Sequence, residues 1–204
     1  MKKIYLLLAI VALAGCSSAS SDKVPETFGP ESETGLAIGT ITFEAERPVN
    51  DIYRFFYEGT TADAKFNKRN GGKIMVKARN NDNQKEFSGD FNSGYTYLFV
   101  VEAQPGTYAF TQYNYLDRIG PTGMVSSSKT FAIPYEVKKG EITYVGELSY
   151  NDLAEPGSPR LVVTDRYGRD LEELGKKYPK IDWKKAVNKT AKAGNNGGGI
   201  VDFR

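Results

Sequence analysis

The sequence contains no histidine and only one cysteine, Cys16, among its 204 residues. Without histidine, Ser-His-Asp triads, Cys-His pairs and most zinc sites are excluded. One cysteine cannot form a disulfide within the chain. We therefore expect no catalytic residues, no metal site and no cofactor, and we expect that the protein is not an enzyme.

Long apolar runs are also missing, except at the start of the chain. Met1–Lys3 is basic, and the eleven uncharged residues of 4–14 follow it. That run is shorter than the about 20 residues that a membrane-spanning helix needs. Its position and length are typical of a secretory signal, which we assign to residues 1–15. The small residues Ala14 and Gly15 suit the narrow site of a signal peptidase.

The end of this signal, Leu13-Ala14-Gly15-Cys16, resembles the signal pattern of bacterial lipoproteins, whose cysteine accepts the lipid. The resemblance implies cleavage before Cys16 and the attachment of lipid, including palmitate, to that residue. Each buried CH₂ contributes about 0.8 kcal/mol, so two or three acyl chains would hold the protein to the membrane. Ser17, in place of aspartate, favours the outer membrane by the same resemblance. The alternative is an ordinary secretory signal that happens to contain a cysteine.

The chain has no strong excess of charge of either sign. Removal of the signal takes Lys2 and Lys3 away and leaves 25 basic residues against 25 acidic ones. The pI of about 8.4 therefore describes the precursor. A nearly neutral protein lacks the electrostatic footprint of nucleic-acid binding, so we expect no nucleic-acid partner.

Composition divides the mature chain into a tether and one folded domain. Residues 16–34 are rich in Ser, Glu, Pro and Gly and predict a flexible tether. Residues 35–168 show short apolar or alternating runs between turn signals and no long helical pattern. This predicts a mainly β fold, an antiparallel β-sandwich of about 7–8 strands with short C-terminal helices. The predicted strands are 36–43, 52–57, 74–79, 95–101, 107–115, 130–137, 141–150 and 160–164.

The turn signals also predict how some strands pair. The turn at 104–106 predicts a hairpin of strands 95–101 and 107–115, and the turn at 138–140 predicts another of 130–137 and 141–150. Strict alternation along the last of these strands predicts one shared face for Ile142, Tyr144, Leu148 and Tyr150.

The C-terminal residues have a different pattern. In segment 169–192, Asp170 with Glu173 resembles a capping box at a short helix that Pro179 ends. Asp182 is expected to cap a second short helix from Trp183 to about Lys189. Residues 193–204 form a Gly/Asn-rich tail that finishes in a short apolar stretch.

Two stretches resemble known domains. Pro105-Gly106-Thr107-Tyr108 is similar to the turn and strand of prealbumin-like and carboxypeptidase-regulatory-like β-sandwiches. Residues 139–146, followed by 170–179, resemble a pattern in bacterial lipoproteins that carry such domains. The likeness covers roughly residues 36–180 in the order of elements. It implies a fold and a location in the cell envelope, but no reaction and no functional residue.

Three patterns suggest chemistry, but each has a simpler interpretation. Ser126–Lys129 matches Ser-x-x-Lys, yet it leads into a strand and lacks the accompanying motifs of penicillin-binding proteins. Asp90–Gly94 alternates oxygen-bearing side chains, yet a calcium loop needs further ligands, so we expect a turn. Acidic pairs are to be expected by chance among 25 acids; the candidates are Glu136, Glu141, Glu147, Asp152 and Glu155.

Lysines and tyrosines leave two interpretations open. A run of lysines with Tyr178 and Trp183 could contact anionic lipid headgroups or an acidic cell-wall polymer, or it is the solvated face of terminal helices with Trp183 packed on the sandwich. Tyrosines in 95–115 could stack sugars, although packing at the core or its rim is the favoured role. The candidate surface-contact residues are Lys176, Lys177, Lys180, Trp183, Lys184 and Lys185.

Together these observations predict a lipid-anchored cell-envelope protein that acts as a non-catalytic binding or structural module. Its expected partners are the membrane, through the lipid on Cys16, and an envelope protein or cell-wall polymer. A carbohydrate- or cell-wall-binding module is the alternative and predicts an exposed aromatic strip. A carboxylate-dependent hydrolase is the third hypothesis and predicts two acids roughly 5–9.5 Å apart in a cleft.

Overall fold

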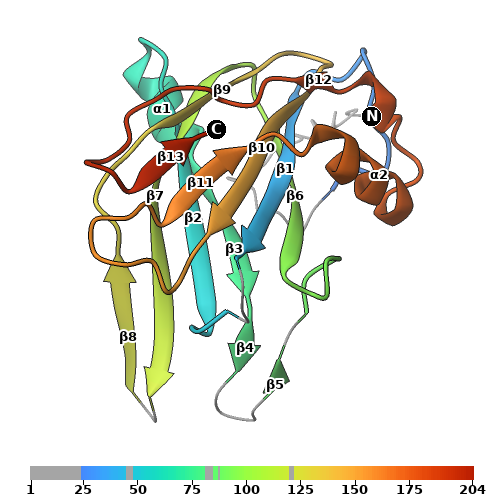
Figure 1. Ribbon diagram of the computed structural model, residues 1–204. Coiled ribbons are helices and arrows are strands. Elements are labelled where there is room, and N and C mark those ends of the chain that lie inside the picture. The colour runs from blue at the N-terminus through green and yellow to red at the C-terminus, as the bar shows by residue number, and fades with distance from the viewer. Residues whose placement is uncertain (1–23, 45–47, 81–84, 87, 120–121) are drawn as a thin grey trace, which may run out of the picture.

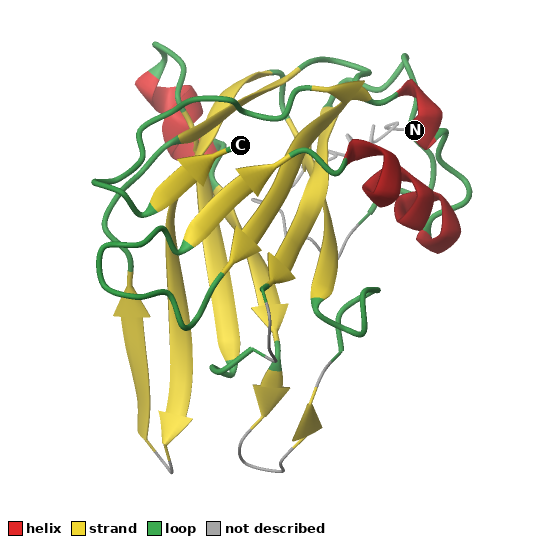
Figure 2. Cartoon of the chain, in the orientation of Figure 1, coloured by secondary structure: helices red, strands yellow, loops and turns green. Residues whose placement is uncertain are grey.

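The computed structural model describes residues 24–44, 48–80, 85–86, 88–119 and 122–204. Most of its strands form two facing sheets, as Figures 1 and 2 show, and the predicted mainly β sandwich with few helices is confirmed. Sheet A has the order β13 (Val201–Phe203), β11 (Leu161–Thr164), β10 (Ile142–Tyr150), β1 (Gly35–Phe43) and β6 (Thr96–Ala103), with β12 (Val187–Asn188) also paired to β10. Sheet B has the order β3 (Gly72–Lys77), β2 (Ile52–Gly59), β7 (Gly106–Ile119) and β8 (Thr122–Ser127), with β9 (Ile133–Val137) also paired to β7.

Both predicted hairpins are wrong, because the chain changes sheet at each turn. Strand β6 pairs with β1 in sheet A, whereas β7 pairs with β2, β8 and β9 in sheet B. Strand β10 pairs with β1 instead of β9. The Tyr108 hydroxyl donates to the Gln104 carbonyl at 2.7 Å and fixes the first crossing. Since each sheet must bury one face, successive apolar strands here pack face to face across the core.

A bulge in β10 corrects the prediction that its apolar residues share one face. Strand β1 runs parallel to β10, and their register shifts so that Ile38 lies opposite Tyr144 but Gly39 lies opposite Gly146. The extra residue turns Ile142 and Tyr144 outward and leaves Leu148 on the inner face. Gly146 adopts φ +111°, and a Cβ on Gly39 would stand 2.3 Å from the Gly146 carbonyl oxygen. Both glycines are needed for the bulge.

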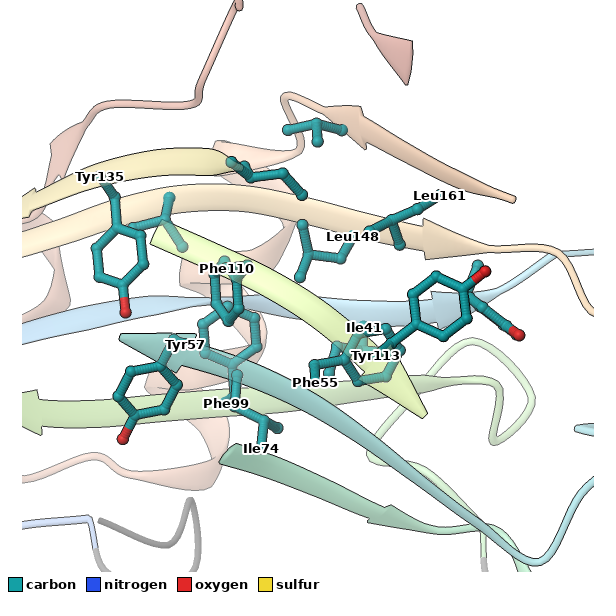
Figure 3. Packing of buried hydrophobic residues seen from close by; sticks show 14 of the residues in the cluster. Ile41, Phe55, Tyr57, Ile74, Phe99, Phe110, Tyr113, Tyr135, Leu148 and Leu161 are labelled. Carbon is teal, nitrogen blue, oxygen red and sulfur yellow. The ribbon is translucent and has the colours of Figure 1, made fainter. Parts of the chain in front are cut away.

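Aromatic rings fill the space between the two sheets. Figure 3 shows Phe99 of sheet A facing Phe110 of sheet B, and these rings meet edge to face at 5.9 Å. Tyr113 and Tyr150 make a similar contact at 5.0 Å. Offset and edge contacts of this kind add about 0.5–1.5 kcal/mol per pair beyond the area buried. The high tyrosine and phenylalanine content is therefore explained mostly by this core.

The outer face of sheet A is covered by a third layer. It consists of α2 (Tyr167–Lys177), the 3₁₀ turn η1 (Trp183–Lys185) and the N-terminal residues 24–34, which lie side by side in Figure 1. Val24 and Phe28 pack against a second apolar cluster with Leu174 and Trp183. Sheet A is consequently buried on both faces, and every residue of β1 and β10 is buried. The second half of the predicted tether thus belongs to the fold.

The last residues of the chain also belong to the sandwich. Strand β13 pairs with β11 in parallel, and Asn195 forms a β-bridge with Ala132. Part of the segment predicted as a tail, Val201–Phe203, is therefore an edge strand of sheet A. A short helix, α1 (Ala64–Arg69), was not expected; its N-cap Asp63 accepts the backbone N–H of Lys65 at 2.8 Å. The β7–β8 hairpin and the pair β4 (Arg79–Asn80) and β5 (Lys85–Glu86) project from the lower end in Figure 1.

Candidate functional site

Charged side chains are buried where α2 lies on sheet A. The bulge in β10 rotates Glu147 to the outer face, beside Thr40 and Thr42 of β1. From the helix, Arg169 and Asp170 approach the same spot. Glu147 is 4% exposed and Asp170 is fully buried, so each needs charged or hydrogen-bonding partners. This buried ionic network is the strongest concentration of ionisable groups inside the described part of the fold.

Asp170 is the innermost member of the network. Its Oδ2 accepts the hydroxyls of Thr40 at 2.8 Å and Tyr144 at 2.7 Å, and its Oδ1 accepts Nε of Arg169 at 2.8 Å. Burial raises the pKa of Asp170 above its ordinary value, and these donors only partly offset that shift. The predicted capping box is wrong, because helix α2 begins at Tyr167 and Asp170 therefore lies within its first turn. The side chain of Asp170 points toward sheet A instead of capping the helix.

Glu147 is the second carboxylate of the network. It accepts the hydroxyls of Thr42 at 2.6 Å and Thr164 at 3.1 Å, and Arg169 Nη2 lies 2.5 Å from its Oε2. Burial alone would raise its pKa, but the hydrogen bonds from Thr42 and Arg169 and the arginine charge outweigh burial and lower it. Arg166, which is more exposed, reaches the same carboxylate at 3.5 Å.

This network is built to hold the helix to the sheet. Arg169 joins both carboxylates, and the carboxylate oxygens already accept donors from the protein. An acid that transfers protons to a substrate must have an oxygen free to meet it. The two buried acids and the partly exposed Arg169 instead fix the position of α2, because a shifted helix would leave buried charges unpaired.

The lysines predicted as a contact surface lie on the third layer, mostly beside acids. Lys176 reaches two helix glutamates at 2.8 Å. Lys177 lies 2.5 Å from Asp90, and Lys184 is exposed. Trp183 is only 3% exposed, and its indole N–H donates to the Tyr178 carbonyl at 2.8 Å. The remaining pairs are Lys180 with Glu26 at 3.7 Å and Lys185 with Asp182 at 3.6 Å.

This arrangement favours the solvated-face interpretation of the lysines. Trp183 packs on the sandwich instead of joining a basic surface, and nearby acids compensate much of the positive charge. The second predicted helix is the short turn η1, and Asp182 precedes it without a side-chain capping hydrogen bond. Sequence reasoning missed Glu26 and Asp90 as partners, since both are distant in the chain.

The other sequence patterns are accounted for by local structure. Asp90 Oδ2 accepts the backbone N–H of Leu98 at 2.7 Å, and Asn92 and Ser93 have φ of 54° and 57°, as in a tight turn. Within the described ranges, no group of three or more His, Cys, Asp or Glu residues is placed to hold a metal ion. Ser126 and Ser127 lie in strand β8.

The tyrosines that the structure describes are inside or at the rim of the fold. Tyr113 is 4% exposed, and Tyr97 and Tyr115 are half-buried against the core. The Tyr53 hydroxyl donates to Asp152 at 2.5 Å, and burial, followed by that hydrogen bond, raises the pKa of Tyr53. Each tyrosine in the part of the chain that the structure describes is buried or half-buried.

Cys16 lies outside the described residues, which begin at Val24 in the third layer. The eight residue steps between them can span at most about 28 Å. Among the described residues, no helix has the length and apolarity required to traverse a membrane.

Comparisons with known proteins give little information about this chain. No protein-family model and no curated protein matches the sequence. A leucine-rich repeat protein from Bacteroides thetaiotaomicron is similar in structure, with 13% sequence identity and a TM-score of 0.31. The match covers 83% of this chain and 20% of that one. A likeness at that level identifies neither a fold family nor a function.

Proposed function

We propose that the protein is a lipid-anchored, non-catalytic module of the bacterial cell envelope, attached to the outer membrane through acyl chains on Cys16. The observation that carries this proposal is the Leu-Ala-Gly-Cys sequence at 13–16, directly after an uncharged segment of signal length. Two or three acyl chains give stable attachment where one does not.

The packing of residues 24–34 supports a domain held close to its anchor. Val24 and Phe28 pack against the apolar cluster on the outer face of sheet A, and Glu33 forms an ion pair with Lys139 at 2.7 Å. Eight residue steps separate Cys16 from Val24, and covalent geometry limits their reach to about 28 Å. The domain would therefore stay within a short distance of the membrane surface.

The buried ionic network supports a role without catalysis. Glu147 and Asp170 are the most buried acids near one another, and both are committed to Arg169 and to hydroxyl donors. We infer that the sandwich binds or supports another component of the envelope. Crosslinking followed by pull-down of the native protein from its own envelope tests this part: a reproducible protein partner supports it, whereas retention on purified cell wall alone would favour the carbohydrate-binding alternative.

The anchor is tested by mass spectrometry of the native protein and by a Cys16→Ser variant. We expect an acylated Cys16 at the mature N-terminus, and we expect the variant to lose this modification and leave the membrane fraction. The matched Ser18→Ala variant, two residues further on, should be acylated and membrane-bound. A native protein that still begins at Met1, or that has an unmodified Cys16, would refute the anchor.

A further inference from the structure

Strand β8 is an edge of sheet B without the features that protect the other sheet edges. Edge strands offer unpaired backbone N–H and C=O groups, and proteins usually guard them with charge, proline or a covering segment. Strand β8 has the sequence Thr-Gly-Met-Val-Ser-Ser and has neither a charged residue nor a proline. Met124 is 60% exposed and Val125 is 56% exposed.

The edges at β3, β9, β6 and β13 are guarded or short. Strand β3, at the opposite end of sheet B, exposes Lys73 and Lys77. Strand β9 exposes Pro134 and Glu136. At the β6 edge of sheet A, Asp90 accepts the backbone N–H of Leu98, and a β-bridge joins Phe91 to Thr96. Strand β13, at the other end of sheet A, is only three residues long.

Val125 also ends an apolar row that crosses sheet B. It lies opposite Leu116 of β7, which in turn lies opposite Ile52 of β2. The neighbouring pair Tyr53 and Tyr115 points into the core, so this row lies on the outer face of the sheet. The row reaches the edge at a half-exposed valine, where a further strand would continue it.

We propose that two copies of this chain pair through β8, antiparallel and with Val125 opposite the partner's Val125. The two-fold axis of such a dimer is perpendicular to the sheet, so the outer face of one copy continues as the outer face of the other. Each β8 residue must therefore lie opposite a partner residue on the same face of the sheet. Centring the axis on Val125 joins the two apolar rows into one. Since β8 is uncharged, the self-pairing brings no like charges together, which would oppose it.

Cysteine crosslinking in the full-length protein tests both the partner and the register. Opposite residues of antiparallel strands have Cα atoms about 4.5–5.5 Å apart, within the range that a disulfide spans. A Val125→Cys variant is therefore expected to shift to twice the monomer mass on a non-reducing gel. In Ser127→Cys, the two thiols would be about 14 Å apart along the strands, so this control should stay at the monomer mass.

Several outcomes would overturn the pairing. These are equal crosslinking of the two variants, a Val125→Cys variant that stays monomeric, and a crosslink to a protein of another mass. The parent chain, without an added cysteine, shows whether Cys16 itself forms disulfides, which would count against its acylation and not against the β8 pairing.

A charge substitution gives a second, independent measurement. Val125→Lys would set two ammonium groups opposite each other, and we expect its sedimentation to change from that of a dimer to that of a monomer. Ser127→Lys faces the partner's Gly123 in this register and should keep the dimer. Since both side chains are exposed, the fold of each variant should be retained, which circular dichroism checks. A parent chain that sediments as a monomer, or equal effects of the two lysines, would overturn the proposal.

Discussion

The two faces of sheet A are both buried, yet they are filled with different chemistry. The inner face meets sheet B through apolar and aromatic side chains such as Ile41, Leu148 and Tyr150. The outer face meets α2 through apolar residues and, beside them, through the ionic network of Glu147, Arg169 and Asp170. The same strands, β1 and β10, serve both interfaces, so the difference lies in the side chains that the bulge distributes between them.

This difference indicates that the two faces of sheet A contribute differently to the stability of the fold and to the position of α2. An apolar interface tolerates small shifts, because dispersion and hydrophobic contacts are not directional. A buried ionic interface does not tolerate them, because each carboxylate loses a partner when the helix moves. We infer that the inner face supplies most of the folding free energy and that the outer face fixes where α2 sits.

Arg169→Met should have the largest effect on this comparison. It leaves Glu147 and Asp170 buried without their shared counter-ion. We expect the free energy of unfolding to fall by about 3 kcal/mol, the lower end of the range for breaking a buried ion pair, because the Arg169 guanidinium is partly exposed. Chemical denaturation measures the loss. Arg166→Met is the matched control, since its side chain is 57% exposed and should contribute little. Equal losses in the two variants would contradict the special role of Arg169.

Removing one tyrosine hydroxyl from the interface at each face of sheet A compares the two faces directly. On the outer face, the Tyr144 hydroxyl donates to Asp170 and accepts the Arg166 backbone N–H. Tyr144→Phe should therefore lower the free energy of unfolding by about 1.5–3 kcal/mol, as for hydrogen bonds to charged groups. On the inner face, the buried Tyr135 hydroxyl has no hydrogen-bond partner among the described residues. Tyr135→Phe should leave stability unchanged or raise it, and a loss as large as that of Tyr144→Phe would contradict this account.

The two acids of the network should respond to pH in opposite directions. The pKa of Glu147 is lowered in the folded protein, so its contribution is present above its ordinary value of 4.5 and is lost as pH falls through the folded-state pKa. The pKa of Asp170 is raised above 3.8 in the folded protein, so its contribution is present below 3.8 and is lost as pH rises through the folded-state pKa. Denaturation of the wild type and of Glu147→Gln from pH 7 to pH 3 measures this. Their difference in unfolding free energy should shrink as pH falls; a constant difference would show that Glu147 does not titrate as proposed.

Much of the fold could be predicted from the sequence, because alternation and turn residues are local signals. Strands β1, β2, β3, β6, β7, β10 and β11 were found close to their observed positions. Their partners were not, because a turn such as Gln104-Pro105-Gly106 suits a hairpin and a crossing between sheets equally well. Choosing between them needs the packing of both sheets, which no short stretch encodes.

The network was missed for a similar reason. Asp170 has the spacing of a capping box with Glu173, and only the observed helix start at Tyr167 moves it inside the helix. Glu147 was one of several acids without a distinguishing neighbour. The one local signal was Gly146 within an otherwise apolar strand, which is typical of a bulge and predicts a change of face at the next residue.

The smallest effect is expected from the exposed charges on the same helix, and it sharpens the contrast between buried and solvated ions. Lys176 pairs with Glu172 and Glu173 at the surface, where water and salt screen the interaction. Lys176→Ala should leave the unfolding midpoint unchanged. Lys177→Ala should lower it measurably, because Lys177 is less exposed and ties α2 to Asp90, which also holds the β6 edge. If both variants lose the same stability, the ion pairs of α2 act through helix propensity alone, and the buried network would have to be reassessed by the same test.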